Sequence, residues 1–323
     1  MAFDRDQIKQ QVARLANAGV FIGTSSWKYP GWCGMLYDEQ RYVSRGKFSE
    51  TALEKNCLPE YAEVFKTTCF DGAYYRFPSP KSLGKLFSEV PEDFQFAFKV
   101  TGEITIKKFP QHARHGVRAG KANENFLNAG LFQDAFLGPC EPFRRQAGLL
   151  MFEFSRFYTS DYEHGREFVV DLDQFLGQLP KGWPYAVEMR NHHWLQPDYF
   201  ACLARHGVAH VFNSWDAMPP VNEQMALPRS RTNPNLCAAR FLLRPGRKYQ
   251  EAVDTFRPYN KVQEPYPEAR EAGAALIAEG KSAGPAHKTF IYVNNRLEGN
   301  ALETIDAMLV RVTAQEEAGT FSS

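Results

Sequence analysis

The sequence lacks the features that mark several large classes of protein. Its six cysteines, at positions 33, 57, 69, 140, 202 and 237, form no Cys-x-x-Cys pair. Scattered cysteines in a chain of 323 residues are typical of reduced, buried thiols, so we expect neither a disulfide framework nor a zinc site. No uncharged apolar run approaches the roughly 18 residues that a membrane-spanning helix needs. The sequence therefore favours neither a disulfide-stapled nor a membrane-spanning protein.

An excess of charge of one sign is also lacking. Lys and Arg number 38 against 37 for Asp and Glu, which gives a formal net charge of +1. A nearly neutral chain does not attract nucleic acid or membranes through its overall field, so nucleic acid is an unlikely partner. The first eleven residues are polar and lack the apolar core of a secretory signal. With 44% hydrophobic and 23% charged residues, the chain is predicted to be a globular, cytoplasmic protein.

Familiar catalytic signatures are missing as well. The chain contains no Gly-x-Ser-x-Gly, no phosphate-binding P-loop and no His-Glu-x-x-His. No glycine-rich fingerprint follows the first apolar run, which argues against a dinucleotide-binding open sheet. The sequence therefore leaves the cofactor unknown and assigns no metal ligands.

The chain does contain a repeated alternation of short apolar runs and helical stretches. Runs rich in Val, Ile, Phe, Tyr and Leu predict eight buried strands, at 20–25, 66–71, 94–100, 148–154, 185–190, 208–213, 237–243 and 289–294. Helices are expected at 50–63, 80–89, 119–136, 166–178, 197–206, 266–280 and 298–313. Eight strand–helix units in about 300 residues predict an α/β fold, a (β/α)8 barrel of the TIM type. A doubly wound open sheet is the alternative.

We expect a single domain with additions at both ends. Ile8, Val12 and Leu15 have helical spacing and predict an extra helix within residues 1–19. The barrel would occupy residues 20–313, and a tail would occupy residues 314–323. Two long connections, 101–120 and 214–236, follow predicted strands. They would emerge at the C-terminal ends of the strands, the face where barrel enzymes keep their active sites.

Polar residues near the strand ends are predicted to point into the barrel, because residues two apart in a strand share a face. Phe94, Phe96 and Phe98 would pack under helices, so Lys99 would face inward. The same rule gives an inward set of Asp71, Lys99, Glu153, Glu188, Arg190, Asn213, Arg240 and, if the seventh strand extends that far, Arg244. Buried charges are costly unless they pair or meet a ligand. The set therefore predicts either a structural layer of salt bridges or a basic pocket for an anion.

Catalytic roles can be suggested within this set. Glu188 is the expected general base or acid, because a neighbouring carboxylate such as Glu153 would raise its pKa. Lys99 is expected to polarise an anionic substrate or, with a carbonyl substrate, to form a Schiff base. Substrate contacts are expected from Arg190, Arg240, Asp71 and Asn213 in the barrel, and from Ser25, Trp27, Tyr29 and Tyr75 just beyond the first two strands. The aromatic residues beyond the first strand could instead form a lid over the barrel end.

The sequence also resembles the YecE-like proteins, a bacterial family of unknown function that is defined by domain of unknown function 72 (DUF72). The resemblance is carried by 23–29, Trp32, Tyr37, 74–78, 94–99, 187–190, Trp194, Arg240 and 292–295. It implies a TIM-barrel-like fold and adds Trp194 and Asn294 as expected substrate-binding residues, but it implies no specific activity.

The chain departs from that family's pattern at several polar positions. Cys69-Phe70-Asp71 stands where the family tends to have Glu-x-Asn, and Glu153-Phe154-Ser155 stands where it has Gln-x-Pro. Ile106 replaces an expected His, and Ser26 replaces the Gly usual before Trp27. The resemblance therefore implies a divergent member, and the changes at polar mouth positions argue against assuming that it shares a substrate with its relatives.

Three functional hypotheses follow. The first is an enzyme that acts on a small phosphorylated or carboxylated molecule at the C-terminal face of the barrel. The second is a divalent-metal-dependent hydrolase or isomerase, with Asp71, Glu153, Glu188 and His193 as oxygen and nitrogen ligands. The third is a non-catalytic binding module, in which the charges form a structural layer and nucleic acid binds the basic loop at 107–121. That loop is otherwise expected to be a solvated surface.

Overall fold

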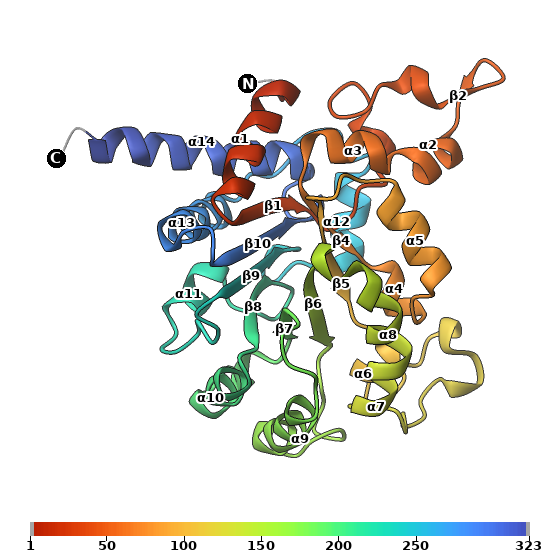
Figure 1. The fold of residues 1–323 in the computed structure, drawn as a ribbon, viewed down its shortest axis with the longest axis vertical. Helices are drawn as coiled ribbons and strands as arrows, with labels where there is room; N and C mark the ends of the chain where they lie inside the picture. Colours follow the sequence, from red (N-terminus) through yellow and green to blue (C-terminus); the bar gives the residue numbers. More distant parts are fainter. Residues whose placement is uncertain (1–2, 321–323) are drawn as a thin grey trace.

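The computed structural model describes residues 3–320, and its centre is a closed barrel of eight parallel strands. The strands follow one another around the barrel in the order β1, β10, β9, β8, β7, β6, β5 and β4, with helices outside them (Figure 1). Their bounds are β1 Val20–Thr24, β4 Thr67–Phe70, β5 Gln95–Lys99, β6 Ala147–Phe154, β7 Tyr185–Met189, β8 Ala209–Ser214, β9 Leu236–Phe241 and β10 Lys288–Val293. Each predicted strand agrees with one of these to within two residues, so the predicted barrel is confirmed.

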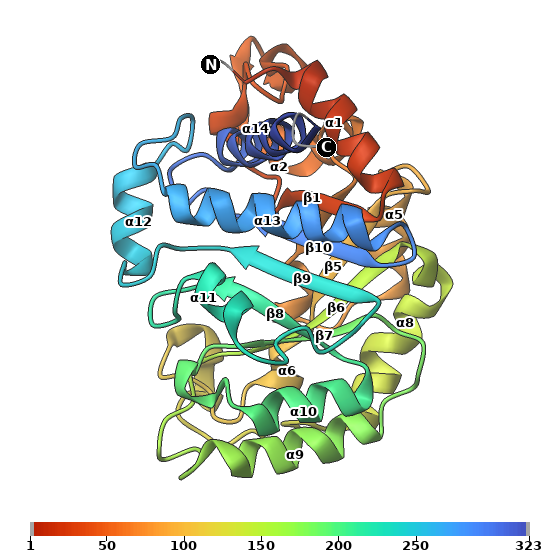
Figure 2. The same cartoon turned by 90° about the vertical axis from the view of Figure 1, so that its left-hand side faces the viewer.

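The helices alternate with the strands along the chain. They are α1 Arg5–Asn17, α2 Glu50–Asn56, α3 Leu58–Val64, α4 Gly72–Tyr75, α5 Pro80–Ser88, α6 Gly102–Thr105, α7 Ala129–Phe132, α8 Gly138–Cys140, α9 Gly165–Gly177, α10 Pro197–His206, α11 Val221–Ala226, α12 Tyr249–Phe256, α13 Pro267–Ala283 and α14 Ala301–Thr320. A small antiparallel hairpin, β2 Val43–Ser44 and β3 Lys47–Phe48, lies outside the barrel. In the side view of Figure 2, α9 and α10 lie next to each other along one edge.

Both ends of the chain are helical within the described residues. Helix α1 buries Ile8, Val12 and Leu15, the residues whose spacing predicted it. Helix α14 continues to Thr320 through most of the stretch expected as a tail, and residues 321–323 lie outside the described part. In the described part of the chain, no helix is both long and apolar enough to cross a membrane.

The helix predicted at 119–136 is wrong in its first ten residues, because helical structure begins only at Ala129. Only α7 and a short π-helical turn at 133–137 form there, and the preceding residues make an irregular loop. The Asn123 side chain donates to the backbone oxygens of Glu103 (2.8 Å) and Ile106 (2.7 Å), which fixes this loop against α6. Leu127 has a positive φ, and Asn128 then caps α7. Side-chain hydrogen bonds to the backbone thus replace the helical ladder.

Two other expectations need smaller corrections. The helix predicted at 50–63 is two helices, because the chain turns at Cys57 and α3 begins with Leu58-Pro59. The two long connections contain short helices, α6 in the first and α11 in the second.

The lower part of the barrel interior is apolar. The inward side chains at this level are Phe21, Cys69, Ala97, Leu149, Met151, Ala186, Ala209, Val211, Leu236, Ala238, Phe290 and Tyr292. On the outer face, Phe94, Phe96 and Phe98 are fully buried in the separate core under the helices. The alternation predicted for the strands is therefore confirmed on both faces, and it fixes which residues reach the upper end of the barrel.

The barrel is closed by a narrow seam between β1 and β4. These strands share one registered pair, Thr24 with Thr68, whereas β1 pairs with β10 at five positions. The Tyr61 hydroxyl from α3 spans the seam: it accepts from the Thr24 amide (3.0 Å) and donates to the Thr67 carbonyl (3.0 Å). Gly23 is required here, since a Cβ would lie 2.2 Å from the Thr67 oxygen. A tyrosine side chain thus joins the two strands where the backbone ladder is short.

Candidate functional site

Two buried carboxylates lie side by side at the C-terminal end of the barrel. Glu153 near the end of β6 is in register with Glu188 near the end of β7. Their exposed fractions are 3% and 0%. Two neighbouring carboxylates without counter-charges would repel each other and would not both stay ionised. The chain therefore has to supply cations at the same level.

Three cations satisfy these carboxylates. Lys99 Nζ lies 2.7 Å from Glu153 Oε2, and Arg190 Nη2 lies 2.7 Å from the same oxygen. Arg190 Nε also donates to Glu188 Oε1 (3.0 Å). Arg240 Nη1 donates to both carboxylates, at 3.2 Å from Glu153 Oε2 and 2.7 Å from Glu188 Oε2. We call these five residues, Lys99, Glu153, Glu188, Arg190 and Arg240, the mouth ion network.

The network holds Lys99 and Glu153 in their charged forms. Burial alone would raise the pKa of Glu153, but the charges of Arg190, Lys99 and Arg240 outweigh it and hold that pKa well below its usual range. Burial would lower the pKa of Lys99, but the Glu153 and Asp71 carboxylates outweigh it, so the pKa is raised. A charged lysine is not a Schiff-base nucleophile, and an ionised Glu153 is not a proton donor. The geometry thus favours electrostatic roles for both.

Both carboxylate oxygens of Glu188 are occupied by arginine side chains. Its Oε1 accepts from Arg190 and its Oε2 accepts from Arg240. With no exposed surface, the carboxylate can meet a substrate only if one arginine moves away. Its predicted role as general base or acid stays a prediction, and in this arrangement Glu188 positions the two guanidinium groups.

Asp71 lies at the edge of the network and is the most accessible of its carboxylates. Its side chain is 46% exposed and lies 4.0 Å from Arg240 Nη2. With Asp71 included, three carboxylates balance three cations. Arg244 does not join them, because its guanidinium lies 4.8 Å from the ring of Tyr266. The network itself is therefore not the net basic lining that the sequence predicted.

Three buried polar side chains at the C-terminal ends of the strands each have an atom without a hydrogen bond in the described part of the chain. Asn213 donates through Nδ2 to the carbonyls of Met189 (3.1 Å) and Val211 (3.3 Å), while its Oδ1 has no hydrogen bond within the described residues. The same holds for Arg240 Nε and for the Ser25 hydroxyl beyond β1. Buried groups of this kind usually find a partner in the protein, in water or in a ligand.

Of the three aromatic residues predicted to contact a substrate, two pack against other rings and one is exposed. Trp27 is buried and stacks on Phe70 at 6.2 Å. Tyr29 packs on Trp32 at 4.8 Å, and burial raises the pKa of its hydroxyl to about 12. Tyr75 is 69% exposed. Trp27 and Tyr29 thus belong to the packed aromatic residues that follow β1, and Tyr75 lies at the surface.

The two residues suggested by the resemblance alone have clear structural partners. Trp194 stacks on Phe157 (5.4 Å) and Phe168 (5.7 Å) within an aromatic cluster under α9. Asn294 accepts from the Arg296 amide (3.0 Å) in the turn after β10. These contacts account for both residues without a substrate, and their predicted role stays a prediction.

A cavity that the sequence analysis missed opens beside Arg190. It has a volume of about 530 Å³ and lies between the loop after β5 and the loop after β6. Its charged lining residues are Lys107, Lys108, Arg114, Arg156, Asp161 and Arg190, and its rings include Tyr74, Phe109, Phe157, Tyr158 and Trp215. We call it the basic cavity. The basic cavity could not be predicted from the sequence, because it forms between two loops and no sequence pattern shows that these loops lie side by side.

The cations of the basic cavity are largely uncompensated. In the described part of the chain, no ion pair is formed by Lys107, Lys108, Arg114 or Arg156. Lys107 is not the solvated residue that the sequence predicted, since its Nζ lies 3.2 Å from the ring centre of Tyr162. Arg190 is shared between the cavity and the mouth ion network, and its guanidinium lies 4.0 Å from the ring of Trp215.

The protein is a (β/α)8-barrel protein. It has paired charges at the mouth of the barrel and a basic cavity beside them. The chain belongs to the family described as "Protein of unknown function DUF72", which matches residues 21–322. Solved structures of DUF72 proteins from Enterococcus faecalis and Thermotoga maritima are similar to it. The former is 18% identical, with a TM-score of 0.60 over 91% of this chain and 95% of that one. The latter is 18% identical, with a TM-score of 0.58 over 92% and 99%.

At these identities the two structures show the fold, which agrees with the barrel described above. No curated protein matches the chain significantly. The resemblance stated from sequence is therefore confirmed, and the family itself names no substrate.

Proposed function

We propose that this protein is an enzyme that acts on a small phosphorylated or carboxylated substrate bound at the mouth of the barrel. The observation that carries the proposal is the basic cavity beside Arg190, whose cations Lys107, Lys108, Arg114 and Arg156 have no ion-pair partners in the described part of the fold. A volume of about 530 Å³ is suited to a small molecule. Uncompensated guanidinium groups bind phosphate and carboxylate in a fork geometry.

Arg190 would connect substrate binding to the buried charges. Its Nε and Nη2 are held by Glu188 and Glu153, which leaves Nη1 to donate to an anion. Trp215 on its face fixes the plane of the guanidinium. Groups fixed before binding need no reorganisation when charge develops on the substrate, and such preorganisation is a large part of electrostatic catalysis.

Lys99 of the mouth ion network and Asp71 beside it are the residues best placed to take part in a reaction. Lys99 lies 3.8 Å from the ring centre of Tyr74, a residue that also lines the cavity, and its raised pKa keeps it a cation. Asp71 is half-exposed and would accept a proton from the substrate. Glu153 and Glu188 would act as positioning residues for the three cations.

A divalent-metal enzyme fits the geometry less well. Glu153 Oε2 and both carboxylate oxygens of Glu188 already accept from Lys99, Arg190 or Arg240. His193 lies against His192, with ring centres 3.6 Å apart, and it lines a different cavity, on the surface beside α9 and α10.

A ligand screen with one designed variant tests the proposal. Thermal unfolding would be measured with inorganic phosphate, phosphorylated and carboxylated metabolites, and short single-stranded oligonucleotides. A ligand at a hundred times its Kd adds about 2.7 kcal/mol to the unfolding free energy, which is readily detected. Arg156→Gln removes an exposed cavity cation without touching the network and is expected to weaken the shift several-fold.

The matched control is Arg166→Gln, which changes an arginine that is 91% exposed on α9. It is expected to leave the ligand-induced shift unchanged. A small anion that stabilises the wild-type protein and is chemically converted would support the proposal. Binding only of oligonucleotides, with a steep dependence on salt, would instead support the binding-module hypothesis. Absence of any shift would contradict the proposal.

A further inference from the structure

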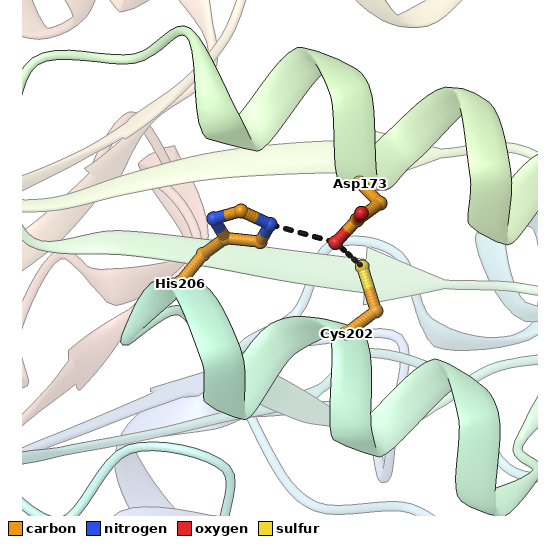
Figure 3. Close-up of side chains that lie close together, drawn as sticks. All are labelled: Asp173, Cys202 and His206. Atoms are coloured by element: carbon orange, nitrogen blue, oxygen red, sulfur yellow. Dashed lines mark hydrogen bonds and ion pairs between the residues drawn. The ribbon is translucent and has the colours of Figure 1, made fainter.

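A second polar cluster lies away from the barrel mouth, between α9 and α10. Asp173 projects from α9, and Cys202 and His206 project from α10 toward it (Figure 3). His206 Nε2 lies 2.8 Å from Asp173 Oδ1, and Cys202 Sγ lies 3.7 Å from the same oxygen. The three side chains offer one nitrogen, one sulfur and one oxygen atom, all within 4.8 Å of one another.

The local structure explains why these atoms meet. Cys202 and His206 are four residues apart on one helix, so they lie one above the other on the same face. Helix α9 packs against that face and brings Asp173 opposite both. Helices thus hold all three ligand atoms, and no loop has to rearrange to bring them together.

The donor set is that of a zinc site. Zinc is bound by Cys sulfur at about 2.3 Å and by His nitrogen or carboxylate oxygen at about 2.0–2.2 Å, in tetrahedral geometry. These bond lengths place the ligand atoms of one site roughly 3.2–3.8 Å apart. The separations of His206 Nε2 and Cys202 Sγ from Asp173 Oδ1, 2.8 and 3.7 Å, are close to that range, and the nitrogen and the sulfur lie within 4.8 Å of each other. Side-chain rotations would therefore bring the three atoms to that geometry.

The cluster is accessible from one side. Cys202 is buried, while the side chains of His206 and Asp173 are 12% and 35% exposed. An ion can therefore enter from solvent, and water can fill the fourth position. Arg205 is the competing cation, with Nη1 2.8 Å from Asp173 Oδ1. Its side chain is 63% exposed, so it can release this oxygen, and Asp173 Oδ2 has no hydrogen bond within the described residues.

We propose that Asp173, Cys202 and His206 form a zinc-binding site that fastens α9 to α10, with a water molecule as fourth ligand. On binding, the thiol of Cys202 gives its proton to solvent and coordinates as the thiolate. The site is distinct from the mouth ion network and does not depend on the proposed function. A bound ion would stabilise the folded chain, because the unfolded chain does not hold the three ligands together.

Cobalt substitution tests the proposal on the full-length, metal-free protein. One equivalent of Co²⁺ is expected to produce a thiolate-to-cobalt charge-transfer band and the intense visible bands of tetrahedral Co²⁺, and Zn²⁺ is expected to displace both. Cys202→Ser should abolish the charge-transfer band, whereas Cys140→Ser, at another buried cysteine in α8, should retain it. His206→Gln should weaken Zn²⁺ binding more than about tenfold, since even changes outside the metal ligands can cost that much.

Two results would overturn the proposal. One is a wild-type protein that gives no thiolate–cobalt band at saturating Co²⁺. The other is a band that persists in Cys202→Ser, which would place the thiolate at another of the six cysteines. If Cys202→Ser does not fold, His206→Gln decides the question, because unchanged Zn²⁺ affinity in that variant also contradicts the site. The exposed His164→Gln is the matched histidine control and should bind Zn²⁺ as the wild type does.

Discussion

The two ends of the barrel interior differ in chemistry although the same strands build both. At the lower level the strands contribute apolar side chains such as Leu149, Ala238 and Phe290. Two residues beyond Ala238 on β9 and four beyond Leu149 on β6, the same faces contribute Arg240 and Glu153, two members of the mouth ion network. Apolar burial stabilises a fold at about 25 cal/mol per Å², whereas a buried ion pair often adds little after desolvation. The lower level is therefore expected to contribute more to stability, and the upper level is where a functional role and a structural one can be separated by experiment.

The largest effect is expected from breaking the upper level. Glu188→Ala removes the counter-charge of Arg190 and Arg240, and it should lower the unfolding free energy by about 3–5 kcal/mol because buried charges lose their partner. Urea unfolding monitored by fluorescence measures the change. A loss below about 1 kcal/mol would show that water already compensates these arginines.

A double substitution sharpens the comparison by making the upper level resemble the lower one. Glu188→Leu with Arg240→Met replaces a buried ion pair by apolar side chains of similar length. Such replacements are often neutral or stabilising, so the double variant should regain most of the loss seen in Glu188→Ala. If the proposed anionic ligand binds at Arg190, the double variant should also show a weaker ligand-induced shift, because Arg190 then keeps only Glu153 as a partner. A double variant as unstable as Glu188→Ala would assign a structural role to the pair.

The matching change at the lower level is Leu149→Ala. It should lower the unfolding free energy by about 2–5 kcal/mol through lost burial and a residual cavity. Ligand-induced stabilisation, measured as the shift of Tm at saturating ligand, should stay as in the wild type. A weaker ligand-induced shift would show that the two levels are coupled rather than separate.

A smaller effect concerns pH and lies outside the barrel interior. Burial lowers the pKa of His210 from 6.5 to about 3. The folded state holds the neutral imidazole, so this contribution to stability is fully present above pH 6.5 and is lost as the pH falls from 6.5 toward 3. In His210→Gln, the drop in unfolding free energy between pH 7 and pH 5 should be smaller than in the wild type.

The exposed His164→Gln provides the control, because its pH dependence should match that of the wild type. An unchanged pH dependence in His210→Gln would show that another group controls the acid sensitivity.

The fold could be predicted from the sequence because its strands are short, apolar and regular. Alternation along β5, β6 and β7 was enough to place Lys99, Glu153 and Glu188 on the inner face, since strand geometry leaves only two directions. The mouth ion network was therefore anticipated in composition. That Lys99 and Arg190 neutralise Glu153 and Glu188 could be predicted too, and the ion pairs confirm it. Which nitrogen meets which oxygen could not, because it depends on the register of neighbouring strands.

The parts that failed depend on contacts distant in sequence. The first ten residues of the helix expected at 119–136 form a loop held by Asn123, whose partners lie in another segment. The basic cavity needs the loops after β5 and β6 to face each other. The Cys202–His206 pair on α10 meets Asp173 only through the packing of α9, so the spacing of residues along the sequence did not single out this cluster.

The seam between β1 and β4 has a consequence for how the barrel opens. With one registered pair and a bridging tyrosine hydroxyl, this contact has less backbone hydrogen bonding to lose than the one between β1 and β10. Amide protons that are exposed by local openings of low free energy exchange with solvent before those that require global unfolding. Hydrogen exchange should therefore begin in β4 and at the edge of β1 that faces it. The barrel would open between these two strands, while β6 to β10 stay hydrogen-bonded as one sheet.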